Sequence, residues 1–281
     1  MMSDFFTALA DPGNTFLRLA LAVGLASSIA FGVIGTYVVS RRISYLAGAV
    51  SHCVLGGIGA ALWLETVCQV KWLDPLAGAL IAALIATFII GRFGHKKGQR
   101  EETMIGATWA IGMALGIIFI DLTPGYFNLT SYLFGDILLV SNRDLLRILV
   151  LDVIILLFAS GCYHQILAVC FDEEFARLRG IRVDFYYQAL LGLTAVTVVL
   201  MVRVVGIVMV IAMLTLPAAT AALFARRLFE MMLLAVFFAA MAIVIGLGIS
   251  YQYSLSSGPV IILVAGLFYF LATTLKSQQQ P

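Results

Sequence analysis

Histidine is scarce in this chain, and one of its three histidines stands inside a long apolar run. His52 lies in the stretch SYLAGAVSHCVLGGIG, residues 44–59, with Gly48 four residues before it and Gly56 four residues after it. Neutral imidazole is a common ligand of zinc and other first-row metals. An ionisable side chain within an apolar span is costly and indicates a functional site by default. The alternative is a packing role, because small residues at four-residue spacing bring membrane helices into close contact.

The composition predicts an all-α polytopic membrane protein. The chain has 281 residues, of which 62% are hydrophobic and only 11% charged, whereas soluble domains have about 25% charged residues. A membrane helix needs about 20 mostly apolar residues. About nine runs meet this requirement, and together they form one transmembrane domain over residues 1–281. The runs are 16–39, 44–64, 75–92, 104–120, 145–163, 185–202, 204–225, 229–250 and 258–275.

One further apolar piece, residues 129–140, is too short to cross the membrane comfortably. It contains Gly135 and Asp136, and Pro124-Gly125 lies a few residues before it. Non-helical backbone at membrane depth is tolerated only where protein or a water-filled cavity covers it. We therefore expect a short re-entrant helix here. The tail at residues 276–281, KSQQQP, is expected to be disordered.

The distribution of basic residues predicts the orientation of the spans. When the loops are numbered alternately, one set holds 12 of the 17 basic residues and the other holds 5. Cytoplasmic loops carry the excess of lysine and arginine, so the N-terminus should lie outside and the C-terminus in the cytoplasm. The smaller set consists of Arg18, Lys71, Arg143, Arg147 and Arg203.

A short polar segment between two spans, residues 171–182, reads FDEEFARLRGIR. Its acidic residues precede its basic ones, which complements a helix dipole, and its glycine suits a helix C-cap. Composition leaves two alternatives open: a solvated linker helix, or a helix over about 171–180 that docks on a cytoplasmic partner. The residues concerned are Asp172, Glu173, Glu174, Phe175, Leu178 and Gly180.

Pro217 lies inside a span, residues 204–225. Proline removes a backbone hydrogen bond and kinks a helix, and hydroxyls such as those of Thr215 or Thr220 can offset the loss. The kink is either ordinary packing or part of a gate. The sequence contains no GxxxxGK[ST] phosphate loop, so any ATP-driven transport would need a separate ATPase chain.

Four stretches occur in an order and spacing that resemble the membrane permeases of bacterial zinc, manganese and iron ABC importers. They are RRISYLAGAVSH, SYLFGDIL, DEEFARLRGI and VVGIVMVIAMLTLPAATA, and the resemblance covers nearly the whole chain. It implies a fold similar to vitamin B12-type importer permeases and a location in the bacterial inner membrane. It implies no enzymatic activity and no tightly bound cofactor, because the partner chain hydrolyses ATP.

The resemblance also implies the partners. They are cytoplasmic ATPase subunits, an extracytoplasmic metal-binding protein and a second permease copy, expected to form a homodimer with a heterodimer as the alternative. The segment 171–180 would then be the coupling helix. Alternative functions are a permease for a metal chelate such as a siderophore or haem, which would usually be longer, and an ion-coupled secondary transporter.

The resembled family usually has D-x-x-x-H in its second span, which places a carboxylate and an imidazole on one helix face. This chain has Gly48 where that aspartate stands. With the resemblance, His52 is expected to be a ligand in the metal pathway, and Asp136 is a candidate for the missing carboxylate. Because the aspartate, a hard oxygen ligand, is absent at position 48, zinc is favoured over manganese or iron as the expected cargo.

Overall fold

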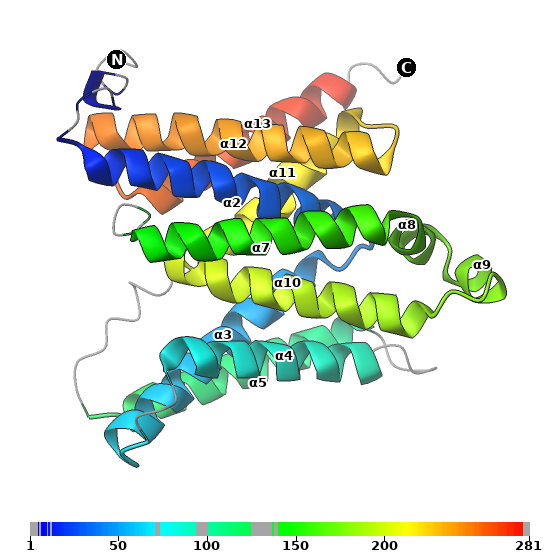
Figure 1. The fold of residues 1–281 in the computed structure, drawn as a ribbon, viewed down its shortest axis with the longest axis horizontal. Helices are drawn as coiled ribbons and strands as arrows, with labels where there is room; N and C mark the ends of the chain where they lie inside the picture. Colours follow the sequence, from blue (N-terminus) through cyan, green and yellow to red (C-terminus); the bar gives the residue numbers. More distant parts are fainter. Residues whose placement is uncertain are drawn as a thin grey trace. The chain divides into compact units, whose positions relative to one another are not determined.

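The computed structural model describes residues 5, 7–9, 11, 13–70, 74–93, 101–124, 137 and 140–277. Helices account for most of these residues, and the described part of the chain contains no strand (Figure 1). The helices are α2 (Thr15–Ser40), α3 (Ser44–Thr66), α4 (Pro75–Phe93), α5 (Glu101–Asp121), α7 (Asn142–Gly161), α8 (Tyr163–Phe171), α9 (Glu173–Leu178), α10 (Val183–Val205), α11 (Ile207–Phe224), α12 (Leu228–Tyr253) and α13 (Ser257–Ser277).

Eight of the described helices are long and apolar enough to cross a membrane, and the number is nine if α7 and α8 form one broken span. Each of the nine predicted runs coincides with one helix to within a few residues. Helix α7 is not counted among the eight by itself, because it contains four charged residues, namely Arg143, Asp144, Arg147 and Asp152. The predicted all-α polytopic fold is confirmed.

The structure describes two short predicted segments only in part. The predicted re-entrant helix at 129–140 lies outside the described residues except for Ile137 and Val140, so it stays a prediction. The predicted disordered tail was placed too early, because Lys276 and Ser277 belong to α13. The Lys276 ammonium donates a hydrogen bond to the carbonyl of Leu223 near the end of α11, which extends the helix to this point.

The chain divides into two compact units, each built from separate stretches of sequence. The first contains residues 1–42, 133–161 and 203–281, and thus α2, α7, α11, α12 and α13. The second contains residues 43–132 and 162–202, and thus α3, α4, α5, α8, α9 and most of α10. The expectation of a single transmembrane domain stays a prediction.

In the first unit, α2 packs closely against α11 and α12. Gly32 lies against the backbone of Val236 in α12, and Gly35 lies against the carbonyl of Leu214 in α11. Such small residues let helix backbones approach closely in membrane proteins. Early residues of α2 meet late residues of α12, since Gly24 contacts Ile243 and Ser40 contacts Met231. The two helices are therefore antiparallel.

The first unit also separates its basic residues between two ends. The end of α2 meets the start of α12, and the end of α13 meets the end of α11. This end therefore holds Arg41, Arg42, Arg226, Arg227 and Lys276, all from the larger set of basic residues. The segment that leads into α7 contacts the first half of α2 instead, where Ile137 approaches Gly24.

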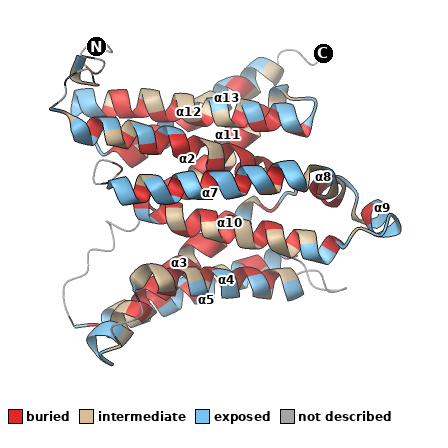
Figure 2. Cartoon of the chain, in the orientation of Figure 1, coloured by how far each residue is buried: buried red, intermediate tan, exposed pale blue. Residues whose placement is uncertain are grey.

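In the second unit, α3 lies between α4 and α5 and packs on both, whereas α4 and α5 contact each other little. The helix α3 is mostly buried and α5 is mostly exposed (Figure 2). A Cβ atom added at Gly56 would lie 2.8 Å from the carbonyl oxygen of Gly112, and one at Gly59 would lie 2.9 Å from that of Gly116. Later residues of α3 therefore meet later residues of α5, so the two helices run parallel.

Candidate functional site

His52 in α3 is half-buried and stacks on Trp109 of α5. The two ring centroids are 4.9 Å apart and the rings are inclined by 18°. The Nδ1 atom of His52 is buried and has no hydrogen-bond partner among the described residues. A packing histidine normally satisfies its buried ring nitrogen, because an unpaired polar atom costs about 1–3 kcal/mol. The unpaired atom therefore favours the ligand interpretation of His52 over the packing one.

Gly48, one turn before His52, also faces Trp109. A Cβ atom added at Gly48 would lie 2.8 Å from Cζ3 and 3.1 Å from Cη2 of the indole. A contact under 3.0 Å forces one of the two groups to move. The indole thus occupies the space that any side chain at position 48 would need, and it lies against His52 at the same time.

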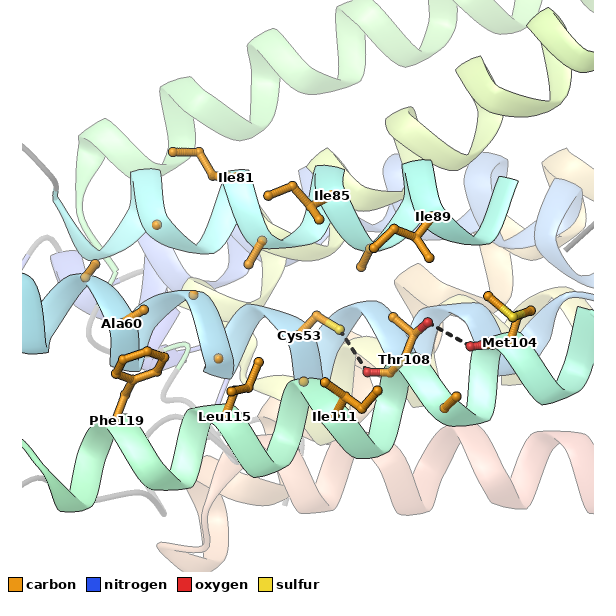
Figure 3. A pocket seen from close by; sticks show the side chains of 18 residues that line it. Cys53, Ala60, Ile81, Ile85, Ile89, Met104, Thr108, Ile111, Leu115 and Phe119 are labelled. Atoms are coloured by element: carbon orange, nitrogen blue, oxygen red, sulfur yellow. Dashed lines mark hydrogen bonds between the residues drawn. The ribbon is translucent and has the colours of Figure 1, made fainter. Parts of the chain in front are cut away.

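The neighbouring residues of α3 line a different feature, a groove between α4 and α5 (Figure 3). This cavity has a volume of about 480 Å³, and its lining is almost entirely apolar. Its two polar groups are already paired: the Cys53 thiol donates to the carbonyl of Thr108, and the Thr108 hydroxyl donates to the carbonyl of Met104. A divalent cation needs several polar ligands, so this groove does not suit an ion.

Further metal ligands do not gather around His52 in the described part of the chain. No group of three or more His, Cys, Asp or Glu side chains there could hold a metal ion. Asp136, the candidate carboxylate, lies outside the described residues, as does His95. His164 is exposed in α8, in keeping with a solvated histidine.

The polar segment at 171–182 forms the six-residue helix α9, narrower than the expected range of about 171–180. The Asp172 carboxylate caps its start by accepting a hydrogen bond of 2.9 Å from the N–H of Phe175. At its end Gly180 has φ +75°, and the N–H of Ile181 donates to the carbonyl of Ala176. The N–H of Gly180 also donates to the carbonyl of Arg177. The two bonds at this end form a Schellman C-cap, as the position of the glycine predicted.

The apolar side chains of α9, and that of Phe171 at the end of α8, are exposed. Leu178 is 87% exposed, Phe171 68% and Phe175 47%. The guanidinium of Arg179 lies 4.8 Å from the centre of the Phe175 ring, and Arg177 pairs with Asp184 at 2.7 Å. An exposed leucine and phenylalanine on a short, doubly capped helix, next to the exposed Phe171 at the end of α8, are unusual for a solvated linker, and they favour the docking alternative.

Pro217 is buried within α11, which is assigned as one continuous helix from Ile207 to Phe224. The carbonyl that proline leaves without its helical donor is that of Met213. The Thr215 hydroxyl bonds the carbonyls of Ile211 and Ala212, and that of Thr220 bonds the carbonyl of Leu216. Neither hydroxyl therefore compensates for the proline in the way we expected.

The structure also reveals a charged cluster that the sequence analysis did not identify. Asp144 at the start of α7 pairs with Arg147 at 3.2 Å and with Arg203 at 3.7 Å, and it accepts a hydrogen bond from the Ser141 hydroxyl. With Arg143 these residues line a shared hollow. The sequence pattern that could have identified this cluster is the smaller set of basic residues, because it contains Arg143, Arg147 and Arg203. Their meeting places the start of α7 and the end of α10 together.

Asp152 is a second residue that the sequence analysis missed. It lies near the middle of α7 and is 4% exposed, and its carboxylate has only a weak hydrogen bond, from the backbone N–H of Ala30 in α2. The signal would have been an aspartate within the predicted span 145–163. A carboxyl group in such a place is costly.

The family of the chain follows from comparison with known proteins. A model of the ABC 3 transport family matches residues 14–276. The chain belongs to the ABC 3 transport family. A probable metal transport system membrane protein of Chlamydia pneumoniae is 36% identical to this family member, over 92% of this chain and 88% of the relative. The manganese transport system membrane protein MntC of Listeria monocytogenes is 32% identical, over 94% and 92%.

Two solved structures resemble this ABC 3 family member. PsaBC from Streptococcus pneumoniae in complex with Fab has a TM-score of 0.83 and 33% identity, and the match covers 97% of this chain and 95% of that one. A putative metal-chelate type ABC transporter in an inward-facing conformation has a TM-score of 0.72 over 93% and 86%, with 13% identity, and shows the fold alone. The named relatives are membrane proteins of transport systems, which confirms the expectation of a transport subunit rather than an enzyme.

Proposed function

We propose that this chain is the membrane permease of an ATP-driven importer of a divalent metal ion. Its membership of the ABC 3 transport family, with relatives named for metal and manganese transport, supports the class of cargo. The observation that carries the assignment of a pathway is His52, a half-buried imidazole in an apolar helix with an unpaired Nδ1. The ion is the transported substrate, and we assign the chain no tightly bound cofactor.

His52 stands about 12 Å along α3 from its start at Ser44, given a rise of about 1.5 Å per residue. That depth is close to the middle of a hydrocarbon core about 30 Å thick. A conducting site has to bind the ion weakly enough to release it, and one imidazole from each of two permease copies would be such a site. Asp136 remains a proposed additional ligand.

Zinc is the proposed preferred cargo. The reason is that a site with an imidazole and no adjacent carboxylate suits zinc better than manganese, which prefers oxygen ligands. The manganese names of several relatives point the other way, so a test has to compare the two metals directly.

The proposed contact with the ATPase is α9. Phe175 and Leu178 would enter an apolar groove of the cytoplasmic ATPase, while Asp172 and Gly180 hold the helix in shape. Glu173 and Glu174 in its first turn add charge that complements the helix dipole. Closure of the ATPase dimer would then be transmitted to the permease through this helix.

The remaining partners follow from the same assignment. An extracytoplasmic metal-binding protein would deliver the ion, and a second permease copy, most simply an identical one, would complete the pathway. We propose an outside N-terminus and a cytoplasmic C-terminus in the bacterial inner membrane. The gathering of Arg41, Arg42, Arg226, Arg227 and Lys276 at one end of the first unit supports this orientation, because lysine and arginine concentrate on the cytoplasmic side.

The test replaces His52 with alanine in cells that depend on this importer. Metal-dependent uptake of ⁶⁵Zn should fall, while the amount of ATPase that co-purifies with the permease should not change. A matched control is His164→Ala, which removes an exposed histidine in α8. Normal uptake by the His52→Ala variant would return His52 to a packing role and remove the proposed pathway.

A further inference from the structure

The face of α3 that carries His52 is covered by another helix, α5. Gly48, His52, Gly56 and Gly59 follow one another at spacings of four, four and three, so they share one face of α3. Trp109 contacts Gly48 and His52, and further along the same face Gly112 and Gly116 contact Gly56 and Gly59. One face of α5 therefore covers this whole stripe.

The contacts of Gly56 and Gly112 fix how far Trp109 lies along α3 and how close it lies to this helix. Each added Cβ at Gly56 or Gly112 would strike the partner helix at 2.8 Å or less, so the two backbones already touch. The Cys53 thiol adds a hydrogen bond of 3.3 Å to the carbonyl of Thr108, the residue before Trp109. Since α5 cannot move outward without losing these contacts, a group added at position 48 has to displace the indole itself.

We propose that Trp109 is the positioning residue of the metal pathway and that Gly48 is required because of it. The indole fills the space of the absent carboxylate and holds the His52 ring by stacking, so that the imidazole meets the passing ion in one orientation. The proposal rests on the proposed function of His52 and adds that Trp109 influences which metal ion is selected. A pathway with an aromatic wall in place of a carboxylate selects against ions that need oxygen ligands.

The steric part of the proposal can be tested without any metal. Replacing Trp63 and Trp72 with phenylalanine leaves Trp109 as the only tryptophan of the chain. In that background, assembled with its ATPase, Gly48→Ala should displace the indole, shift its emission maximum and increase its quenching by acrylamide. Unchanged emission and quenching would overturn the proposed pairing of Gly48 with Trp109.

The positioning part is tested by uptake of zinc. Trp109→Leu should lower uptake by about tenfold or more, the usual effect of removing a group that orients a metal ligand, and Trp109→Phe should restore most of it because a ring remains to stack. Trp63→Leu is the matched control, since Trp63 packs on Phe119 across the same two helices with ring centroids 5.8 Å apart. Equal losses in the two leucine variants would reduce Trp109 to a structural role.

The specificity part is tested by restoring the carboxylate. Gly48→Asp alone should block uptake, because the aspartate and the indole cannot share the space. Adding Trp109→Ala should recover transport and raise the ratio of manganese to zinc uptake by about tenfold, as expected when an oxygen ligand joins a nitrogen one. Normal zinc uptake by Gly48→Asp alone would contradict the proposal. Normal uptake by His52→Ala would instead show that His52 is not part of the metal pathway. The contact between Gly48 and Trp109 would still be tested by the emission of the Gly48→Ala variant.

Discussion

Truncation of Leu178 in α9 gives a direct measure of the proposed docking. The side chain is 87% exposed in the isolated permease, so Leu178→Ala should not change the folding of this chain by more than about 0.5 kcal/mol. If the leucine enters a groove of the ATPase, the substitution removes three buried carbon atoms, and the loss is about 2 kcal/mol. That loss corresponds to about 30-fold weaker association at each docking site.

The assay titrates purified ATPase into permease held in nanodiscs and reads the dissociation constant by fluorescence anisotropy. Leu255→Ala is the matched control, because Leu255 is also exposed and lies in the connection between α12 and α13. Binding of the Leu178→Ala variant within twofold of the control would refute the docking of α9. Melting temperatures of both variants show that the permease itself is intact.

Three further predictions concern single positions. Gly180→Ala should weaken ATPase association in the same titration, because an L-residue at φ +75° costs about 1 kcal/mol or more and unwinds the end of α9; unchanged affinity would show that the C-cap is dispensable. Gly56→Leu should lower the melting temperature and the yield of assembled complex, since the backbones of α3 and α5 touch there, whereas Gly192→Leu has open space around it and should not. Asp152→Asn should raise the melting temperature at neutral pH, because neutralising a buried carboxylate that has no charged partner among the described residues removes a desolvation cost of several kcal/mol; a lower value would mean that the charge is needed.

The long elements could be predicted from the sequence because a bilayer imposes a minimum length on each apolar run. The caps of α9 were predictable for a similar reason, since an aspartate before a helix and a glycine after it act locally. Asp172 accepts from Phe175 three residues on, and Gly180 lies two residues after Leu178, the last residue of the helix.

The contact between His52 and Trp109 could not be predicted in the same way. The two residues are far apart in the chain, and α5 is apolar on all sides, so hydrophobic periodicity does not say which of its faces meets α3. The meeting of Asp144 with Arg203 is likewise non-local. The sequence showed only that Gly48 stands where the resembled family usually has an aspartate, and the structure was needed to show that Trp109 of α5 lies against this position.

ATP-driven metal transport through His52 can be measured in proteoliposomes that contain the permease with its ATPase and its metal-binding protein. The measurement is the initial rate of zinc and manganese uptake, with ATP and with a non-hydrolysable analogue, for the natural chain and for His52→Ala. We expect uptake to require ATP and the ATPase, and to fall in the His52→Ala complex while assembly is normal. Uptake by the permease alone, without ATPase or ATP, would contradict this expectation.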